Sequence, residues 1–140
     1  MADEDASQYE AWLLLNASGL TARRQRELLE ALGSPDAILG ADNQRLQDVE
    51  GITASHVRKI RAAQAEIDPA GIRQMLDELH AHLVPITDER YPKLLRETDD
   101  PPPLLYVRGE LTSHDELAVA MVGTRKRSPY GEQVAELRKV

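Results

Sequence analysis

The sequence has no cysteine, no phenylalanine and a single tryptophan. Without cysteine there is no disulfide, no thiol nucleophile and no cysteine-ligated zinc or iron–sulfur cluster. The longest apolar runs, such as residues 117–122, are far shorter than the roughly 18 residues that a membrane-spanning helix needs. The start of the chain is acidic, with Asp3, Glu4 and Asp5, whereas a signal peptide starts with basic residues. These absences predict a cytoplasmic protein.

The chain also has fewer basic than acidic residues. The 140 residues carry a net charge of −7, with 41% hydrophobic and 29% charged residues, as in ordinary globular proteins. A uniformly basic surface for nucleic-acid phosphates is therefore excluded. The charge is unevenly spread, however, because residues 120–140 hold 5 basic and 2 acidic side chains against 12 and 22 in residues 1–119. We expect any anion site near the C-terminal end.

Residues 9–67 have the pattern of short helices joined by glycine turns. Gly33 is suited to end one helix, and the next begins with Ser34 as N-cap and Pro35 in its first position. Apolar residues spaced by three to four positions predict a further helix from Thr53. Trp12 is expected to anchor a small aliphatic core in this all-helical part.

Residues from 68 onward change in character. Asp68-Pro69 ends the preceding helix and starts another, an amphipathic helix with apolar positions 72, 75, 76, 79 and 83. This helix leads into a short strand at 83–86. The four prolines between Tyr91 and Pro103 predict an extended connector. Strands are expected at 104–107 and at 117–122, the latter buried on both faces of a parallel sheet. The sequence therefore predicts an α/β protein with a helical domain over 1–67 and the start of an α/β domain over 68–140.

The histidines do not form a recognisable metal site. His80 and His82, both placed on the predicted helix, point in different directions, and His56 and His114 lack carboxylates at ligand spacing. We expect neither a metal nor another cofactor.

Two near-repeats lie 32 residues apart, Gly19-Leu20-Thr21-Ala22 and Gly51-Ile52-Thr53-Ala54. Each is followed by a basic helix, which is the layout of paired helix-hairpin-helix units whose backbone N–H groups face a phosphate. The basic residues are Arg23, Arg24 and Arg26 after the first turn, and His56, Arg58, Lys59 and Arg61 after the second. Threonine stands where such units usually have a second glycine. The alternative interpretation is that the threonines cap helices and the basic residues form a solvated face. Weak DNA contact and protein docking remain further alternatives.

The strongest motif is the loop of residues 122–131, Val-Gly-Thr-Arg-Lys-Arg-Ser-Pro-Tyr-Gly, between the last predicted strand and a helix. Its glycine admits close backbone approach, its hydroxyls and N–H groups are donors, and Arg125 can bind an anion through two nitrogens. The glycine spacing is neither that of a dinucleotide-binding loop nor that of a P-loop. The alternative is an ordinary strand-to-helix turn with three cations.

A series of motifs in fixed order strongly resembles the DNA-processing protein A family (DprA, also called Smf). The motifs are Tyr91-Pro92-Lys93-Leu94-Leu95, Asp100-Pro101-Pro102, Leu105-Tyr106-Val107-Arg108-Gly109, Val122-Gly123-Thr124-Arg125 and Ser128-Pro129-Tyr130-Gly131. They cover residues 88–137, whereas residues 9–67 resemble the family in architecture alone.

The resemblance implies a SAM-like helical domain followed by an extended Rossmann-type domain that binds single-stranded DNA. It implies a non-enzymatic protein that protects DNA during natural transformation and helps to load the RecA recombinase. The residues that fall on the family's anion-binding loop are Gly123, Thr124, Arg125, Ser128, Tyr130 and Gly131. Arg125 is the leading phosphate contact, and Lys126 and Arg127 rank lower.

The chain is short for this family. A Rossmann-type domain needs several βα units, and the sequence ends in the helix after the first, so we interpret the chain as an N-terminal portion. In the family the later units supply the rest of the DNA pocket, the contact of a homodimer and much of the RecA-docking surface. Two alternatives remain: a nucleotide-binding Rossmann enzyme of phosphoribohydrolase type, and a protein-interaction module formed by residues 9–67.

Overall fold

The structure is a computed structural model that describes residues 2–112, 128–130 and 133. Seven helices and two strands follow one another in these residues. They are α1 (Ala2–Ala17), α2 (Ala22–Leu32), α3 (Pro35–Gly40), α4 (Asn43–Gln47), α5 (Ala54–Glu66), α6 (Pro69–Glu78), β1 (Ala81–Pro85), α7 (Lys93–Arg96) and β2 (Leu104–Arg108). In the described part of the chain, no helix is long and apolar enough to cross a membrane.

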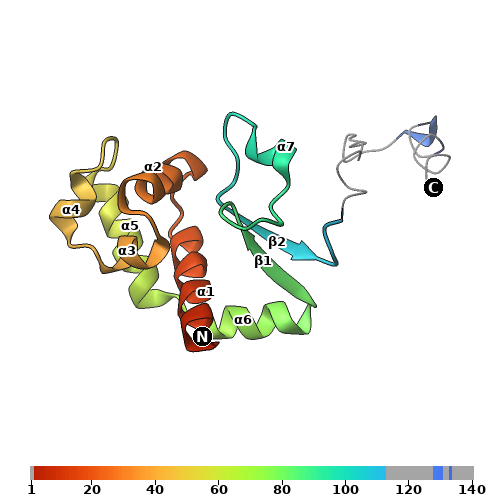
Figure 1. Cartoon of the computed structure of the whole chain (residues 1–140), viewed down its shortest axis with the longest axis horizontal. Helices are drawn as coiled ribbons and strands as arrows, with labels where there is room; N and C mark the ends of the chain where they lie inside the picture. Colours follow the sequence, from red (N-terminus) through yellow and green to blue (C-terminus); the bar gives the residue numbers. More distant parts are fainter. Residues whose placement is uncertain (1, 113–127, 131–132, 134–140) are drawn as a thin grey trace.

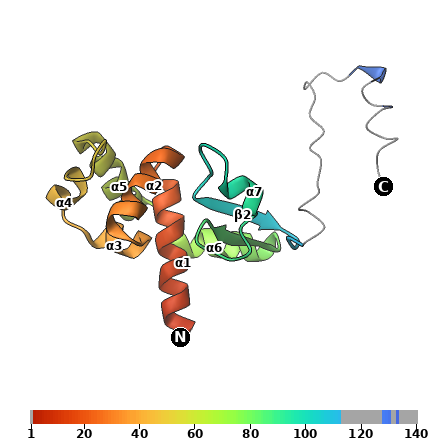
Figure 2. The same ribbon diagram turned by 45° about the horizontal axis from the view of Figure 1, so that its top comes forward.

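Helix α1 stands between two groups of elements (Figures 1 and 2). Helices α2 to α5 pack on one side of it, and α6 with the two-stranded sheet packs on the other. This protein is mostly helical with a small antiparallel sheet, which is compatible with the α/β class expected from the sequence.

The helix starts follow the capping residues in the sequence. The side chains of Thr21, Ser34, Asp42 and Asp68 each accept a hydrogen bond from a backbone N–H in the first turn of the following helix. An N-cap of this kind stabilises a helix by about 1 kcal/mol because it satisfies a donor that the helix leaves unpaired. The helix starts predicted after Thr21, Ser34 and Asp68 are therefore confirmed.

A first hydrophobic cluster holds the helices α1 to α5 together. Its buried members are Leu15, Leu20, Leu28, Ile38, Ala41, Leu46, Ile52, Val57 and Ile60. Val57, Ile60 and Ala63 are buried on α5, as the spacing of apolar residues predicts. No aromatic residue belongs to this cluster among the described residues.

A second cluster joins α1 to α6 and the sheet. It consists of Trp12, Leu13, Leu76, Leu83 and Leu104, and the Trp12 side chain is only 2% exposed. The prediction that Trp12 is a buried structural residue is confirmed. Its expected place in the core of the helical bundle is wrong, because its neighbours come from α6 and the two strands.

Strands β1 and β2 are antiparallel, with Leu83 opposite Tyr106 and Pro85 opposite Leu104. The strand expected at 83–86 starts earlier, at Ala81, and the strand expected at 104–107 is confirmed over Leu104–Arg108. The predicted proline-rich connector contains the short helix α7, which sequence periodicity did not indicate. The strand predicted at 117–122 lies outside the described residues.

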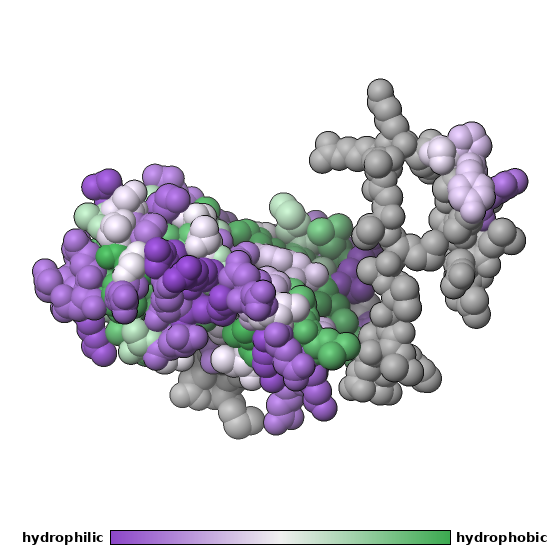
Figure 3. Space-filling view, turned by 90° about the horizontal axis from the view of Figure 1, so that it is seen from above, coloured by the Kyte–Doolittle hydropathy of each residue, from purple (hydrophilic) through white to green (hydrophobic). Residues whose placement is uncertain are grey.

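The expected placement of two histidines is corrected here. His80 and His82 are not on a helix, because His80 follows α6 with a φ of 52° and His82 lies in β1. The apolar side of α6 is incompletely covered, since Met75 and Leu79 are 60% and 50% exposed. Hydrophobic side chains are visible toward the sheet end of the molecule in the view from above (Figure 3).

Candidate nucleic-acid interface

The predicted anion-binding loop is described by the structure at two of its eight candidate residues. Ser128 and Tyr130 are exposed, Tyr130 stands in a short helical segment, and its side chain is 76% exposed. The other candidates lie outside the described residues. They are Gly123, Thr124, Arg125, Lys126, Arg127 and Gly131.

Residues 88–103, which we call the strap, connect β1 to β2 and carry two of the family motifs. Tyr91 is 1% exposed and its hydroxyl donates to the carbonyl of Pro102 over 2.8 Å. The Arg96 guanidinium lies 5.4 Å from the centre of the Tyr91 ring, within the range of a cation–π contact. Burial raises the pKa of Tyr91 above its ordinary value. Both ends of the strap are therefore held together around one buried aromatic ring.

Asp88 and Arg90 form an ion pair at the start of the strap. Arg90 donates from Nε to Oδ1 over 3.0 Å and from Nη2 to Oδ2 over 2.7 Å. The hydrogen bonds from Arg90 hold the pKa of Asp88 below its ordinary value. A guanidinium that already grips a carboxylate in this forked way has fewer donors for a phosphate, so this pair stabilises the turn.

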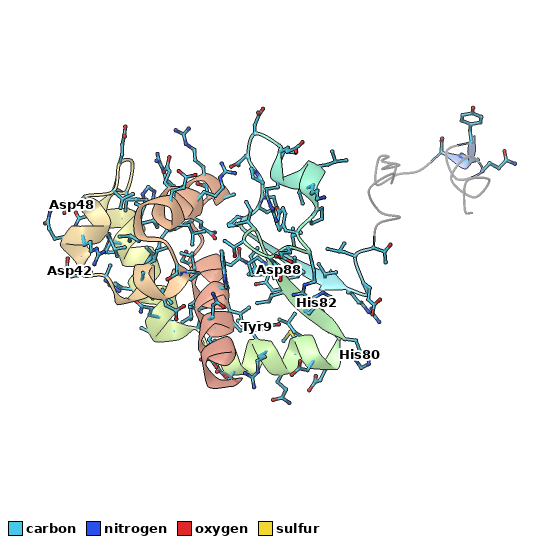
Figure 4. The ribbon with its side chains drawn as sticks, viewed as in Figure 1. Tyr9, Asp42, Asp48, His80, His82 and Asp88 are labelled. Carbon is cyan, nitrogen blue, oxygen red and sulfur yellow. The ribbon has the colours of Figure 1, made fainter. Side chains whose placement is uncertain are left out.

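A shallow pocket of about 530 Å³ lies beside this ion pair, lined by His80, His82, Arg90 and Glu110 among others. Figure 4 places His82 and Asp88 close together at the sheet and His80 at the end of α6. Within the described residues, no group of three or more histidines and carboxylates could hold a metal ion. The pocket combines one carboxylate with cationic or titratable groups.

The two glycine turns of the near-repeat have the predicted backbone form. Gly19 and Gly51 have φ angles of 70° and 79°, which L-residues with side chains rarely adopt. The two turns are also bridged by cations. Lys59 on α5 donates to the carbonyl of Gly19 over 3.3 Å, and the Arg24 guanidinium on α2 fills the space beside Gly51. Each turn thus receives a cation from the helix that follows the other turn.

The cations near these turns are engaged with groups of the same bundle. Arg23 and Arg24 both pair with Glu27, and the hydrogen bond from Arg24 lowers the Glu27 pKa. Thr21 accepts from the backbone N–H of Arg24, and the backbone N–H of Thr53 donates to His56 Nδ1. These contacts favour the interpretation in which the threonines cap helices and the cations balance local carboxylates.

Two arginines have structural contacts that the sequence analysis missed. Arg26 reaches from α2 to the strap, and Arg61 donates to the carbonyls of Leu39 and Ala41 and to Asn43 Oδ1. The expectation that Arg61 belongs to a solvated basic face is therefore wrong. The sequence carried no signal for either contact, because the partners are backbone carbonyls distant along the chain.

Known proteins are similar to the C-terminal part of the chain. Residues 82–139 match the family of DNA recombination-mediator protein A. Protein Smf of Escherichia coli (strain K12) is 40% identical over 62 residues, which is 44% of this chain and 17% of that protein. No solved structure matches the chain. The match takes in the whole loop of residues 122–131 and the whole strap, so both segments are similar to DNA recombination-mediator protein A.

Proposed function

We propose that this chain binds single-stranded DNA through the loop of residues 122–131. The observation that carries the proposal is the family match, because residues 82–139 include the whole loop. The charge distribution agrees with it, since residues 120–140 are the net cationic part of an otherwise acidic chain. The family match supports a role in DNA recombination, and single-strand binding is the specific form that we propose for it.

In this proposal Arg125 forms the leading phosphate contact, and Lys126 and Arg127 add less specific attraction. Gly123 lets the backbone approach the strand, and the hydroxyls of Thr124 and Ser128 donate hydrogen bonds. Tyr130 has a different part. Its ring is 76% exposed, and an exposed aromatic ring beside a cationic loop is suited to stack on a base.

We further propose that this chain takes part, as a homodimer in the cytoplasm, in the delivery of single-stranded DNA to the RecA recombinase in natural transformation. The proposed role is binding rather than catalysis. The proposed folds are a SAM-like or helix-hairpin-helix bundle for the helices before residue 68 and the opening of a Rossmann-type domain after it. The paired glycine turns and their reciprocal cations support the former assignment.

The stacking contact can be tested with a labelled oligonucleotide of thymidines, titrated with the full chain and with Tyr130→Ala and Tyr130→Phe. We expect Tyr130→Ala to weaken binding by about 1–3 kcal/mol, the contribution of one stacked base, and Tyr130→Phe to retain binding. Tyr106→Ala is the matched control, because Tyr106 lies on β2 and is 48% exposed. Equal affinities for Tyr130→Ala and the unmodified chain would remove Tyr130 from the interface.

Delivery to the recombinase needs its own test. RecA is added to an oligonucleotide coated with single-strand-binding protein, and its DNA-dependent ATP hydrolysis is followed with and without the full chain. The proposal predicts a shorter lag when the chain is present. A lag that the chain leaves unchanged or lengthens would contradict a delivery role for this chain.

A further inference from the structure

Arg26 of α2 ties the tip of the strap to the helical bundle. Its Nη1 donates to the carbonyl of Pro101 over 3.0 Å and its Nη2 donates to the carbonyl of Asp99. The same Nη2 lies 2.9 Å from Asp100 Oδ1. The Arg26 side chain is 19% exposed, whereas that of Asp100 is 60% exposed. One guanidinium thus grips the backbone and the carboxylate of an acidic turn 73 to 75 residues away in sequence.

The base of the strap is held separately from its tip. Antiparallel pairing ends at Pro85 and Leu104, and the backbone N–H of Ile86 then donates to Pro103 over 2.9 Å. The Tyr91 hydroxyl adds its bond to Pro102. The base is therefore fixed by groups of the strap and the sheet. The polar contacts of Arg26 join the strap to α2.

Without the polar contacts of Arg26, the tip of the strap would have little to hold it against the helical bundle. Leu29, one turn further along α2, packs partly buried against both hydrophobic clusters. Helix α2 therefore also packs against the second cluster. The tip itself consists of exposed polar and acidic residues, Glu97, Thr98, Asp99 and Asp100, which have no apolar surface of their own to bury against the bundle.

We propose that Arg26 is a positioning residue that holds the strap against α2, in what we call the closed strap. When this guanidinium is lost or its charge is screened, the tip of the strap moves away from α2, which gives the open strap. The closed strap neutralises Arg26 with an acidic turn of the family-matching segment. The open strap returns that cation to solvent beside Arg23 and Arg24. Because one arm of the contact is ionic and partly exposed, it weakens as the Debye length falls from about 10 Å at 0.1 M salt to about 3 Å at 1 M. The two carbonyl contacts require the planar fork of arginine, which lysine lacks.

The absence of cysteine makes the strap directly measurable. Ala62→Cys on the exposed side of α5 and Glu97→Cys at the tip of the strap supply two labelling sites in the full chain. Spin labels on both report the distribution of distances between the bundle and the tip. At low salt we expect one narrow peak, and in 1 M sodium chloride we expect part of that peak to be lost.

Three substitutions then separate the contributions. Arg26→Gln should abolish the narrow peak, and Asp100→Asn, which removes the ionic arm alone, should abolish it in part. Arg26→Lys should keep only the part of the narrow peak that depends on the ion pair with Asp100. Arg23→Gln is the matched control, because it lies on the same helix and pairs with Glu27 within α2.

The proposal is overturned if Arg26→Gln keeps the narrow peak, or if Arg23→Gln broadens it to the same extent. Circular dichroism of each labelled variant establishes that α2 remains helical. If Arg26→Gln does not fold, the exposed Asp100→Asn variant decides, because its side chain can be changed without disturbing the helix. If Asp100→Asn gives the same distance distribution as the labelled chain with Asp100 intact at every salt concentration, the ionic closure is refuted.

Discussion

Replacement of Trp12 by alanine should be among the most damaging single changes in this chain. The Trp12 side chain is 2% exposed and lies in the cluster that joins α1 to α6 and both strands. Truncating a buried tryptophan to alanine typically costs about 3–5 kcal/mol, from lost burial and from the cavity that remains. Domains of this size are stable by about 5–15 kcal/mol, so the variant is expected to be close to unfolding.

The measurement is urea denaturation of the full chain followed by far-ultraviolet circular dichroism, because Trp12→Ala has no tryptophan fluorescence. Leu94→Ala is the matched control, since Leu94 is 67% exposed and its truncation should change stability by less than about 0.5 kcal/mol. Trp12→Phe keeps an aromatic ring in the cluster, so its free energy of unfolding should lie between those of Trp12→Ala and Leu94→Ala. A Trp12→Ala variant as stable as Leu94→Ala would refute the second cluster as a source of stability.

The single tryptophan also reports on which cluster a substitution disturbs. Leu83→Ala changes a direct neighbour of Trp12, whereas Ile38→Ala changes the first cluster. We expect the native emission of Trp12 to shift to longer wavelength in Leu83→Ala and to stay unchanged in Ile38→Ala. A fragment of residues 1–67 lacks the α6 and sheet side chains of this cluster, so its Trp12 emission should be shifted as well. Native-like emission from that fragment would contradict this packing.

Three further predictions concern the bundle and the strap. Arg61→Ala removes donors to two backbone carbonyls at the end of α3 and should cost about 1.5–3 kcal/mol, whereas truncation of the exposed Arg58 should have little effect on the melting temperature. Gly51→Ala, at a φ of 79°, should destabilise the chain by about 1–2 kcal/mol, whereas Gly40→Ala inside α3 should not. The ion pair with Arg90 lowers the pKa of Asp88 in the folded chain. The Asp88 carboxylate therefore stabilises the fold above its unfolded pKa of about 3.9, and this stabilisation is lost as the pH falls through the lower folded pKa. Acid titrations of stability for the unmodified chain and Asp88→Asn should therefore diverge above that range and converge below it.

Local sequence signals located most of the helices, because caps and apolar spacing act within a few residues. Ser34-Pro35 and Asp68-Pro69 begin helices in the structure where the sequence predicts them. The short helix Lys93–Arg96 was missed because four residues are too few for an apolar period, and the prolines around it favour an extended chain.

Long side chains that reach distant backbone were not predictable. Arg26 and Arg61 look like members of a solvated basic face in sequence, yet both donate to carbonyl groups of other segments. The partner of Trp12 was equally hidden, because apolar spacing indicates that a side chain is buried but not which element covers it. The loop of residues 122–131 could be singled out from the sequence because its residues are consecutive, and the family match includes them. Anion binding by this loop stays a prediction.

The proposed DNA contact is tested most directly by the salt dependence of binding. The full chain and its Arg125→Ala variant are titrated onto a fluorescent single-stranded oligonucleotide at several salt concentrations, with Arg45→Ala on the exposed side of α4 as the matched control. If Arg125 contacts one phosphate, Arg125→Ala weakens binding and reduces the slope of log affinity against log salt by about 0.7, while Arg45→Ala leaves the slope unchanged. Equal slopes and affinities for Arg125→Ala and the unmodified chain would contradict the proposal that this loop holds the DNA.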